Sequence, residues 1–258
     1  IITKNSDKID TDELLAGPIK LMNGQSILEM FDMLHILRTY DDSTFVHSVN
    51  VSIISCIIAR WCNYPDKKIN LAMLCGLLHD IGKITIPDEI IRKPGKLTTE
   101  EFEIIKNHTK NGYDILKNKS LNENVPLAAL MHHERCDGSG YPGGRVGKDI
   151  NTYAKIVAIA DVYDAMTSAR CYRGAMCPFT VIDILVKERL QKYDPKFIIT
   201  FIEHMGETYL DNRVRLSNGE EGKIVFIDPK TPSQPMVQRD DGKVLNLTEL
   251  NLSVVEIL

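Results

Sequence analysis

The chain of 258 residues lacks several features that would assign it to common classes of protein. No apolar run approaches the ~20 residues that a membrane-spanning helix needs. The 31 basic and 35 acidic residues give a net charge of -4 and leave no basic arm that could bind nucleic acid by charge alone, so we expect no DNA partner. The chain starts at Ile1 without the basic, apolar and small-residue order of a signal peptide. We therefore expect a soluble, cytoplasmic piece of a longer protein.

Closely spaced cysteine pairs are missing as well. The six cysteines contain no CxxC spacing; they are Cys56, Cys62, Cys75, Cys136, Cys171 and Cys177. A chain long enough to bury a hydrophobic core does not need a disulfide framework. We expect buried free thiols in a reducing cytoplasm.

Two common nucleotide-binding motifs are also absent. The sequence has no GxxxxGK[ST], which excludes a P-loop. Five glycines fall between Gly138 and Gly147, but this loop follows a predicted helix rather than a strand, so a Rossmann dinucleotide site is not supported.

Helical periodicity dominates the chain from about residue 25 to 210. Apolar residues at spacings of three and four predict a helix through Val46 and Trp61, and Thr98 with Glu101 forms a capping box that opens another. Further helices are predicted around 71–78, from Pro126 to about Glu134, and at about 152–167, 179–191 and 195–210. The fold class is therefore mainly α.

The pattern changes to alternation after residue 212. Asn218-Gly219 and Asp241-Gly242 each separate short alternating runs, which is typical of hairpin turns. We divide the chain into an N-terminal extension or linker (1–22), a helical catalytic domain (23–212) and a small β module (213–258). Gly17 and Pro18 are expected to interrupt any long element in the extension.

Polar side chains interrupt the apolar stripes of the predicted helices. They are His47, His79, Asp80, His108, His132, His133 and Asp161. Buried polar groups without partners cost several kcal/mol, so these should be satisfied by something. Each one alone is explained more simply as a core histidine with a hydrogen-bond partner or as a capping or paired aspartate. Together they could converge from five helices, and imidazole with carboxylate suits Zn, Fe, Mn or Ni.

The same residues lie in blocks whose order resembles the HD-GYP family, the metal-dependent phosphodiesterases of the HD superfamily that degrade cyclic di-GMP. The blocks are His47; His79-Asp80-Ile81-Gly82-Lys83; His108; His132-His133-Glu134 through Gly140-Tyr141-Pro142; Asp161 to Thr167; and Arg170-Cys171-Tyr172-Arg173. The resemblance spans about residues 25–210, and the terminal β module is also similar to the tail of many members.

The resemblance implies an HD-type helical bundle and a role for each block. His47, His79, Asp80 and Asp161 would hold one metal, while Asp80 would bridge to a second metal held by His108, His132 and His133. Lys83 would act near the scissile phosphate, and Arg170 and Arg173 would hold the dinucleotide. The Gly140-Tyr141-Pro142 loop would shape the pocket and contact partner proteins. Fe or Mn fits this ligation best, while Zn and Ni remain open.

The sequence departs from some members of the family at one position. Those members use a Glu four residues before the first histidine to hold a third metal, and here that position is Ser43. Asp42 is no substitute, because residues five apart do not share a helix face. We expect two metals.

The implied reaction is hydrolysis of cyclic di-GMP to pGpG, with further cleavage to GMP left open. Two cations about 3.5–4 Å apart can hold a hydroxide between them and clamp the phosphate oxygens. Two alternatives are a cyclic-dinucleotide receptor without turnover and a signalling module whose GYP loop docks a partner. A complete ligand set argues against a pure receptor. The sequence leaves open the choice among cyclic dinucleotides, a homodimer, the upstream sensor and the role of the β module.

Overall fold

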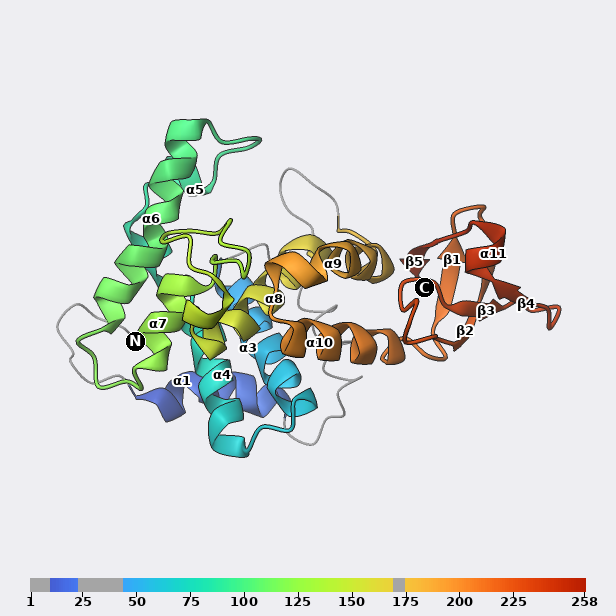
Figure 1. The fold of residues 1–258 in the computed structure, drawn as a ribbon, viewed down its shortest axis with the longest axis horizontal. Coiled ribbons are helices and arrows are strands. Elements are labelled where there is room, and N and C mark those ends of the chain that lie inside the picture. The colour runs from blue at the N-terminus through green and yellow to red at the C-terminus, as the bar shows by residue number, and fades with distance from the viewer. Residues whose placement is uncertain (1–9, 23–43, 169–174) are drawn as a thin grey trace.

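The computed structural model describes residues 10–22, 44–168 and 175–258. A bundle of helices precedes a small sheet, which confirms the predicted fold class (Figure 1). The described helices that precede the sheet are α1 (Thr11–Met22), α3 (Thr44–Trp61), α4 (Asp66–Leu78), the 3-10 helix η1 (Ile81–Thr85), α5 (Asp88–Ile91), α6 (Thr99–Leu116), α7 (Asn124–Met131), the 3-10 helix η2 (Gly147–Asp149), α8 (Thr152–Thr167), α9 (Pro178–Lys192) and α10 (Pro195–Glu207). No helix in these ranges is long and apolar enough to cross a membrane.

The core of the bundle is built around α3. Its residues Ile53, Ile54 and Ile57 are fully buried, and the helix packs against both α4 and α8. A helix that is apolar on nearly all sides is stable only when neighbours surround it. Polar residues on such a helix, including His47 and Asn50, are therefore held inside the bundle rather than in solvent.

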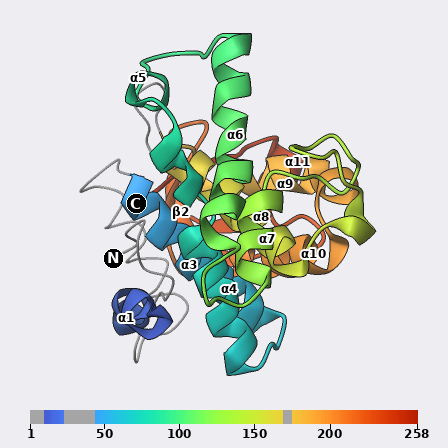
Figure 2. The same cartoon turned by 90° about the vertical axis from the view of Figure 1, so that its left-hand side faces the viewer.

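Helix α6 lies beside this core and starts at the predicted capping box. The Thr98 hydroxyl accepts a hydrogen bond from the Glu101 amide at 3.2 Å, and the Glu101 carboxylate accepts one from the Thr98 amide at 2.7 Å. Figure 2 shows α6 standing upright in front of α7 and α8. The helix packs against η1 and α7, and so brings His108 to the end of α4.

The N-terminal segment differs from the sequence-based expectation. Helix α1 continues through Pro18, so the prediction that Gly17 and Pro18 interrupt the segment is wrong. A proline inside a helix removes one backbone hydrogen bond. Leu15, which is only 5% exposed, packs against the core cluster, and this burial favours the helix despite the local cost.

The C-terminal residues form a five-stranded antiparallel sheet in the order β4-β3-β2-β1-β5. The elements are β1 (Arg213–Leu216), β2 (Glu221–Phe226), β3 (Met236–Gln238), β4 (Val244–Asn246), α11 (Leu247–Leu250) and β5 (Val254–Ile257). Gly219 and Gly242 take positive φ in the two predicted turns. The sheet lies at the opposite end of the long axis from α5 and α6 (Figure 1).

The cysteines within the described residues are all free. Cys56 and Cys75 are buried, while Cys62, Cys136 and Cys177 are half-buried. The prediction of buried free thiols therefore holds for Cys56 and Cys75. The burial part is wrong for the other three, and Cys171 lies outside the described residues.

Candidate metal centre

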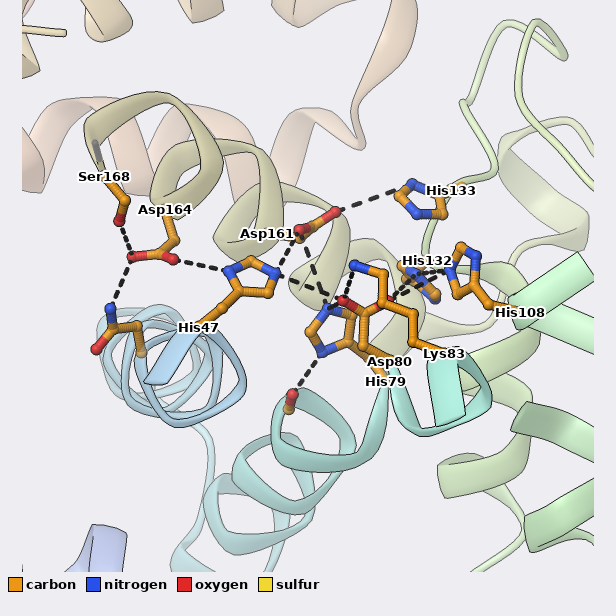
Figure 3. Close-up of polar contacts among 12 residues, drawn as sticks. His47, His79, Asp80, Lys83, His108, His132, His133, Asp161, Asp164 and Ser168 are labelled. Atoms are coloured by element: carbon orange, nitrogen blue, oxygen red, sulfur yellow. Dashed lines mark hydrogen bonds and ion pairs between the residues drawn. The ribbon is translucent and has the colours of Figure 1, made fainter. Parts of the chain in front are cut away.

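Seven side chains predicted as metal ligands lie together where helices of the bundle meet (Figure 3). His47 is on α3 and His79 caps the end of α4, with Asp80 directly before η1; His108 is on α6, His132 and His133 follow α7, and Asp161 is on α8. His79 and His132 are fully buried, and Asp80 is 4% exposed. The apolar helices thus enclose a polar centre.

The potential ligand atoms fall into two groups that share Asp80. One group contains His47, His79 and Asp80, and the other contains Asp80, His108, His132 and His133; within each, the ligand atoms lie within 4.8 Å of one another. Asp161 lies beside both groups, because one carboxylate oxygen is 3.1 Å from His47 Nε2 and the other is 3.8 Å from His133 Nδ1. A shared carboxylate is the element that could join two cations.

Backbone carbonyls orient three of the histidine rings. His79 Nδ1 is 2.7 Å from the Gly76 oxygen, and His108 Nδ1 is 2.7 Å from the Ile105 oxygen. His132 Nδ1 is 2.9 Å from the Ala129 oxygen. Because a carbonyl oxygen can only accept, Nδ1 of each neutral ring carries the hydrogen. The lone pair of each Nε2 therefore points into the centre.

Two buried ligand atoms of the centre have no hydrogen-bond partner among the described residues, as expected of a cation site. His79 Nε2 and Asp80 Oδ1 are both buried and unpartnered in the described part of the chain. His108 Nε2 and His132 Nε2 are 3.2 Å apart, so two lone pairs face one another when both rings carry hydrogen on Nδ1. A cation accepts all of these electron pairs, and imidazole with carboxylate is a donor set for transition metals.

The electrostatics of the centre also suit a cation. Burial opposes ionisation of Asp80, but the neighbouring His79 and Lys83 outweigh it and hold its pKa well below the usual range. Burial lowers the pKa of His133 to about 3, and burial with the neighbouring histidines holds the pKa of His132 well below its usual value. Ionised carboxylate and neutral imidazole are the forms that bind metal.

His47 is the exception among these rings. Burial lowers its pKa, but hydrogen bonds to Asp161 and Asp164, together with the negative charge of Asp161 and Asp80, raise the pKa to about 9. Burial likewise disfavours ionised Asp161, but the hydrogen bond from His47 and the nearby His133 hold the pKa of Asp161 well below its usual range. A metal binding at His47 must therefore displace a proton.

The residues predicted to contact substrate are only partly within the described structure. Lys83 Nζ lies 2.5 Å from Asp80 Oδ2, and a quarter of the lysine side chain is exposed. The Tyr141 ring stacks on His133 with centroids 4.7 Å apart, and a cis peptide joins it to Pro142. Arg170 and Arg173 lie outside the described residues, as do Asp42 and Ser43.

The glycine-rich loop packs closely against the backbone of the segment that carries His133 and Glu134. A Cβ at Gly140 would lie 2.4 Å from the backbone of His133, so only glycine permits this approach. The buried Glu134 accepts hydrogen bonds from the amides of Gly143 at 2.7 Å and Arg145 at 2.9 Å. Sequence reasoning missed this role of Glu134, although a carboxylate directly after two buried histidines was a signal.

Asp164 was also missed. It is 1% exposed and contacts His47, and the sequence analysis assigns it no role. Asp161 and Asp164 are three residues apart on an apolar helix and therefore share a face, which could have indicated that both point to the centre.

A family model described as the HD domain matches residues 35–197. The chain is 38% identical over 190 residues to the cyclic di-GMP phosphodiesterase PA4108 of Pseudomonas aeruginosa, covering 73% of this chain and 46% of that protein. It is 43% identical over 151 residues to a cyclic di-GMP phosphodiesterase of Thermotoga maritima, covering 57% of this chain and 41% of that protein. It is 31% identical over 181 residues to the 3'3'-cGAMP-specific phosphodiesterase 2 of Vibrio cholerae, covering 69% of this chain and 34% of that protein. The chain thus spans less than half the length of these relatives.

Among solved structures, the fold is similar to that of Bd1817, an HDG"Y"P protein from Bdellovibrio bacteriovorus. The TM-score is 0.55 at 19% identity, over 76% of this chain and 70% of that one. At this identity the similarity concerns the fold.

Proposed function

The chain belongs to the HD-domain family and carries the sequence blocks of its HD-GYP members, and from this we propose that it is a metal-dependent phosphodiesterase acting on cyclic di-GMP. The observation that carries the proposal is the pair of ligand groups sharing Asp80, in which buried His79 Nε2 and Asp80 Oδ1 have no hydrogen-bond partner among the described residues. Leaving buried polar atoms without a hydrogen-bond partner costs free energy, and a purely structural site gains nothing in return. Such atoms are expected where a ligand completes the site.

The cofactors in this proposal are two divalent transition-metal ions. His47, His79, Asp80 and Asp161 hold one, and Asp80, His108, His132 and His133 hold the other. Fe or Mn suits the mixed imidazole and carboxylate donors best, with Zn and Ni as the other options. Two such cations supply a water of lowered pKa and charge that holds the phosphate oxygens. Ser43 in place of the third-metal Glu supports a count of two.

Lys83 is proposed to act on the phosphate. Its ammonium group lies at the edge of the centre, bonded to Asp80 at 2.5 Å and partly open to solvent. A cation there stabilises the negative charge that grows on the phosphoryl oxygens during cleavage.

The rest of the substrate is proposed to contact the GYP loop and the two arginines. Tyr141 lies over His133 at 4.7 Å, so a dinucleotide bound at the centre meets this ring. Arg170 and Arg173 follow the end of α8, the helix that carries Asp161, and guanidinium groups bind phosphate bidentately. The product in this scheme is pGpG. The GYP loop also remains the proposed docking site for a partner protein.

The test of the proposed function compares cyclic di-GMP with 3'3'-cGAMP as substrates, because a relative at 31% identity is named as specific for 3'3'-cGAMP. The experiment incubates the protein, loaded anaerobically with Fe²⁺ or Mn²⁺, with each cyclic dinucleotide and follows the products by chromatography. Asp80→Ala provides the control that lacks the shared ligand. Conversion of cyclic di-GMP to pGpG by the wild type alone supports the proposal. Tight binding of cyclic di-GMP without turnover would favour the receptor alternative.

A further inference from the structure

Asp164 lies behind His47, on the side of the ring that faces away from the other ligands (Figure 3). His47 Nδ1 is 2.7 Å from Asp164 Oδ2, while Nε2 of the same ring is 3.1 Å from Asp161 Oδ1 and 3.7 Å from Asp80 Oδ2. The ring thus stands between a carboxylate that belongs to neither ligand group and the proposed cation site. Nδ1 of His47 contacts Asp164, and Nε2 faces the proposed cation site.

His47 differs in this respect from its neighbours. Four rings of the centre form a hydrogen bond through Nδ1 within the described part of the chain. In His79, His108 and His132 the partner is a backbone carbonyl three residues earlier on the same segment. In His47 the partner is a carboxylate 117 residues further along the chain. A carboxylate carries a full negative charge, which a carbonyl does not.

The carboxylate is itself held firmly in place. Its other oxygen, Oδ1, accepts hydrogen bonds from Asn50 Nδ2 at 3.1 Å and from Ser168 Oγ at 3.1 Å. Asp164 is 1% exposed, and a carboxylate so deeply buried is tolerated only when its oxygens are hydrogen-bonded. Asn50 lies three residues after His47 on α3, so one helix supplies both the ring and a clamp on its partner.

We propose that Asp164 is a positioning residue that holds His47 with hydrogen on Nδ1, aims Nε2 at the cation site shared with His79 and Asp80, and strengthens that site selectively through its charge. The inference rests on the metal centre of the proposed function and is independent of the substrate. In metal sites generally, a carboxylate bonded to the outer nitrogen of a ligand histidine fixes the ring and raises its basicity, and its loss lowers metal affinity about 10–100-fold. In the other group, Nδ1 of His108 and of His132 bonds a backbone carbonyl, and His133 Nδ1 lies 3.8 Å from Asp161, which is itself a proposed ligand. The affinity of that group should therefore not depend on Asp164.

The competing explanation is that Asp164 only ties α3 to α8. The variant Asp164→Asn distinguishes this explanation from the proposal, because the amide has the same shape and can still hydrogen-bond but carries no charge. Asp164→Glu keeps the charge on a side chain one methylene longer and tests rescue. Ser168→Ala is the matched control, since it removes one hydrogen bond to Asp164 and leaves the His47 contact intact.

The experiment titrates the metal-free 258-residue chain with Mn²⁺ by calorimetry and measures the thermal unfolding of each variant. We expect two classes of site in the wild type. In Asp164→Asn one class weakens about 10–100-fold and the other stays within about twofold. Asp164→Glu should retain more Mn²⁺ affinity at the weakened class than Asp164→Asn does, even if its unfolding temperature is lower. Ser168→Ala should bind both equivalents of Mn²⁺ with wild-type affinity. Nitrogen spectra of the Zn²⁺-loaded protein, which is diamagnetic, should show hydrogen on His47 Nδ1 in the wild type.

Three results would overturn the inference. Unchanged affinity at both classes in Asp164→Asn, with only a lower unfolding temperature, would leave Asp164 a structural tie. Equal weakening of both classes would refute the selective effect. A wild type that binds no Mn²⁺ would refute the metal centre itself, and so distinguishes failure of the proposed function from failure of this inference alone.

Discussion

Gly82 lies so close to His108 that no side chain fits between them. A Cβ built on Gly82 would be 1.9 Å from the carbonyl oxygen of His108 and 2.5 Å from the amide nitrogen of Gly112. This contact lets η1 press directly against α6. As a result His108 Nε2 comes within 3.3 Å of Asp80 Oδ1, so the backbone approach sets the distance between two proposed ligands.

Replacing Gly82 should therefore disturb both the fold and the centre. Gly82→Ala is expected to lower the free energy of unfolding by about 1–3 kcal/mol, because the backbones must move apart to admit the methyl group. Gly17→Ala is the control: a Cβ there meets nothing within 4 Å, and alanine in a helix should raise stability by about 0.5–1 kcal/mol. Urea unfolding and metal analysis check both variants. A Gly82→Ala protein with wild-type stability and metal content would show that η1 does not need this contact.

Metal affinity should depend on pH through His47. The pKa of His47 in the metal-free protein is raised from its usual 6.5 to about 9, so a proton leaves when metal binds. Mn²⁺ affinity of this half of the centre should rise about tenfold per pH unit from 7 to 9 and then level off. Calorimetry in buffers of different ionisation enthalpy should detect release of one proton from His47. Affinity that stays flat between pH 7 and 9 would contradict the raised pKa.

The raised pKa of His47 also affects the stability of the metal-free protein, which should fall with rising pH while metal affinity increases. Because the folded-state pKa is the higher one, protonated His47 stabilises the fold fully below pH 6.5, and this contribution is lost as pH rises through about 9. Unfolding of His47→Gln beside the wild type over this range isolates the contribution of the ring.

Lys83 should affect turnover more than metal binding. Lys83→Ala is expected to lower kcat about 10²-fold, because one positive charge at the phosphate is lost, while bound metal stays at the wild-type level. Lys110→Ala, at an exposed position of α6, is the matched control and should have wild-type kinetics. Steady-state rates with cyclic di-GMP, together with metal analysis, make the comparison. If kcat is unchanged, Lys83 serves only as the ion-pair partner of Asp80.

Arg170 and Arg173 should affect binding of the dinucleotide. Losing one charge-assisted contact of about 1.5–3 kcal/mol raises the dissociation constant roughly tenfold to a hundredfold. Arg170→Ala and Arg173→Ala should show this change in calorimetric titration with cyclic di-GMP, with bound metal unaffected. Wild-type affinity in both variants would mean that neither arginine holds the substrate.

The parts of the molecule that sequence predicted well are those determined by local chemistry. The Thr98 capping box and the turn at Asn218-Gly219 depend on a few neighbouring residues, and both are found where predicted. The ligand candidates could be identified because polar residues on apolar helices must find partners inside the fold.

What could not be predicted depends on how distant segments pack. Asp164 contacts a ring 117 residues away, and only the packing of α3 against α8 makes that contact. On local grounds Gly17 and Pro18 are expected to interrupt any long element, but the helix continues through both, and burial of Leu15 favours it. The close approach of Gly82 to α6 is likewise invisible in a pattern of side chains, because it is a contact between backbones.

The central claim is that Asp80 joins two cations, and an anomalous-scattering map of the crystalline Mn²⁺-loaded protein tests it most directly. Two peaks are expected, one beside His47, His79 and Asp161 and the other beside His108, His132 and His133, with one carboxylate oxygen of Asp80 on each or a single oxygen shared. A single peak, three fully occupied peaks, or two peaks of which only one contacts Asp80 would contradict it.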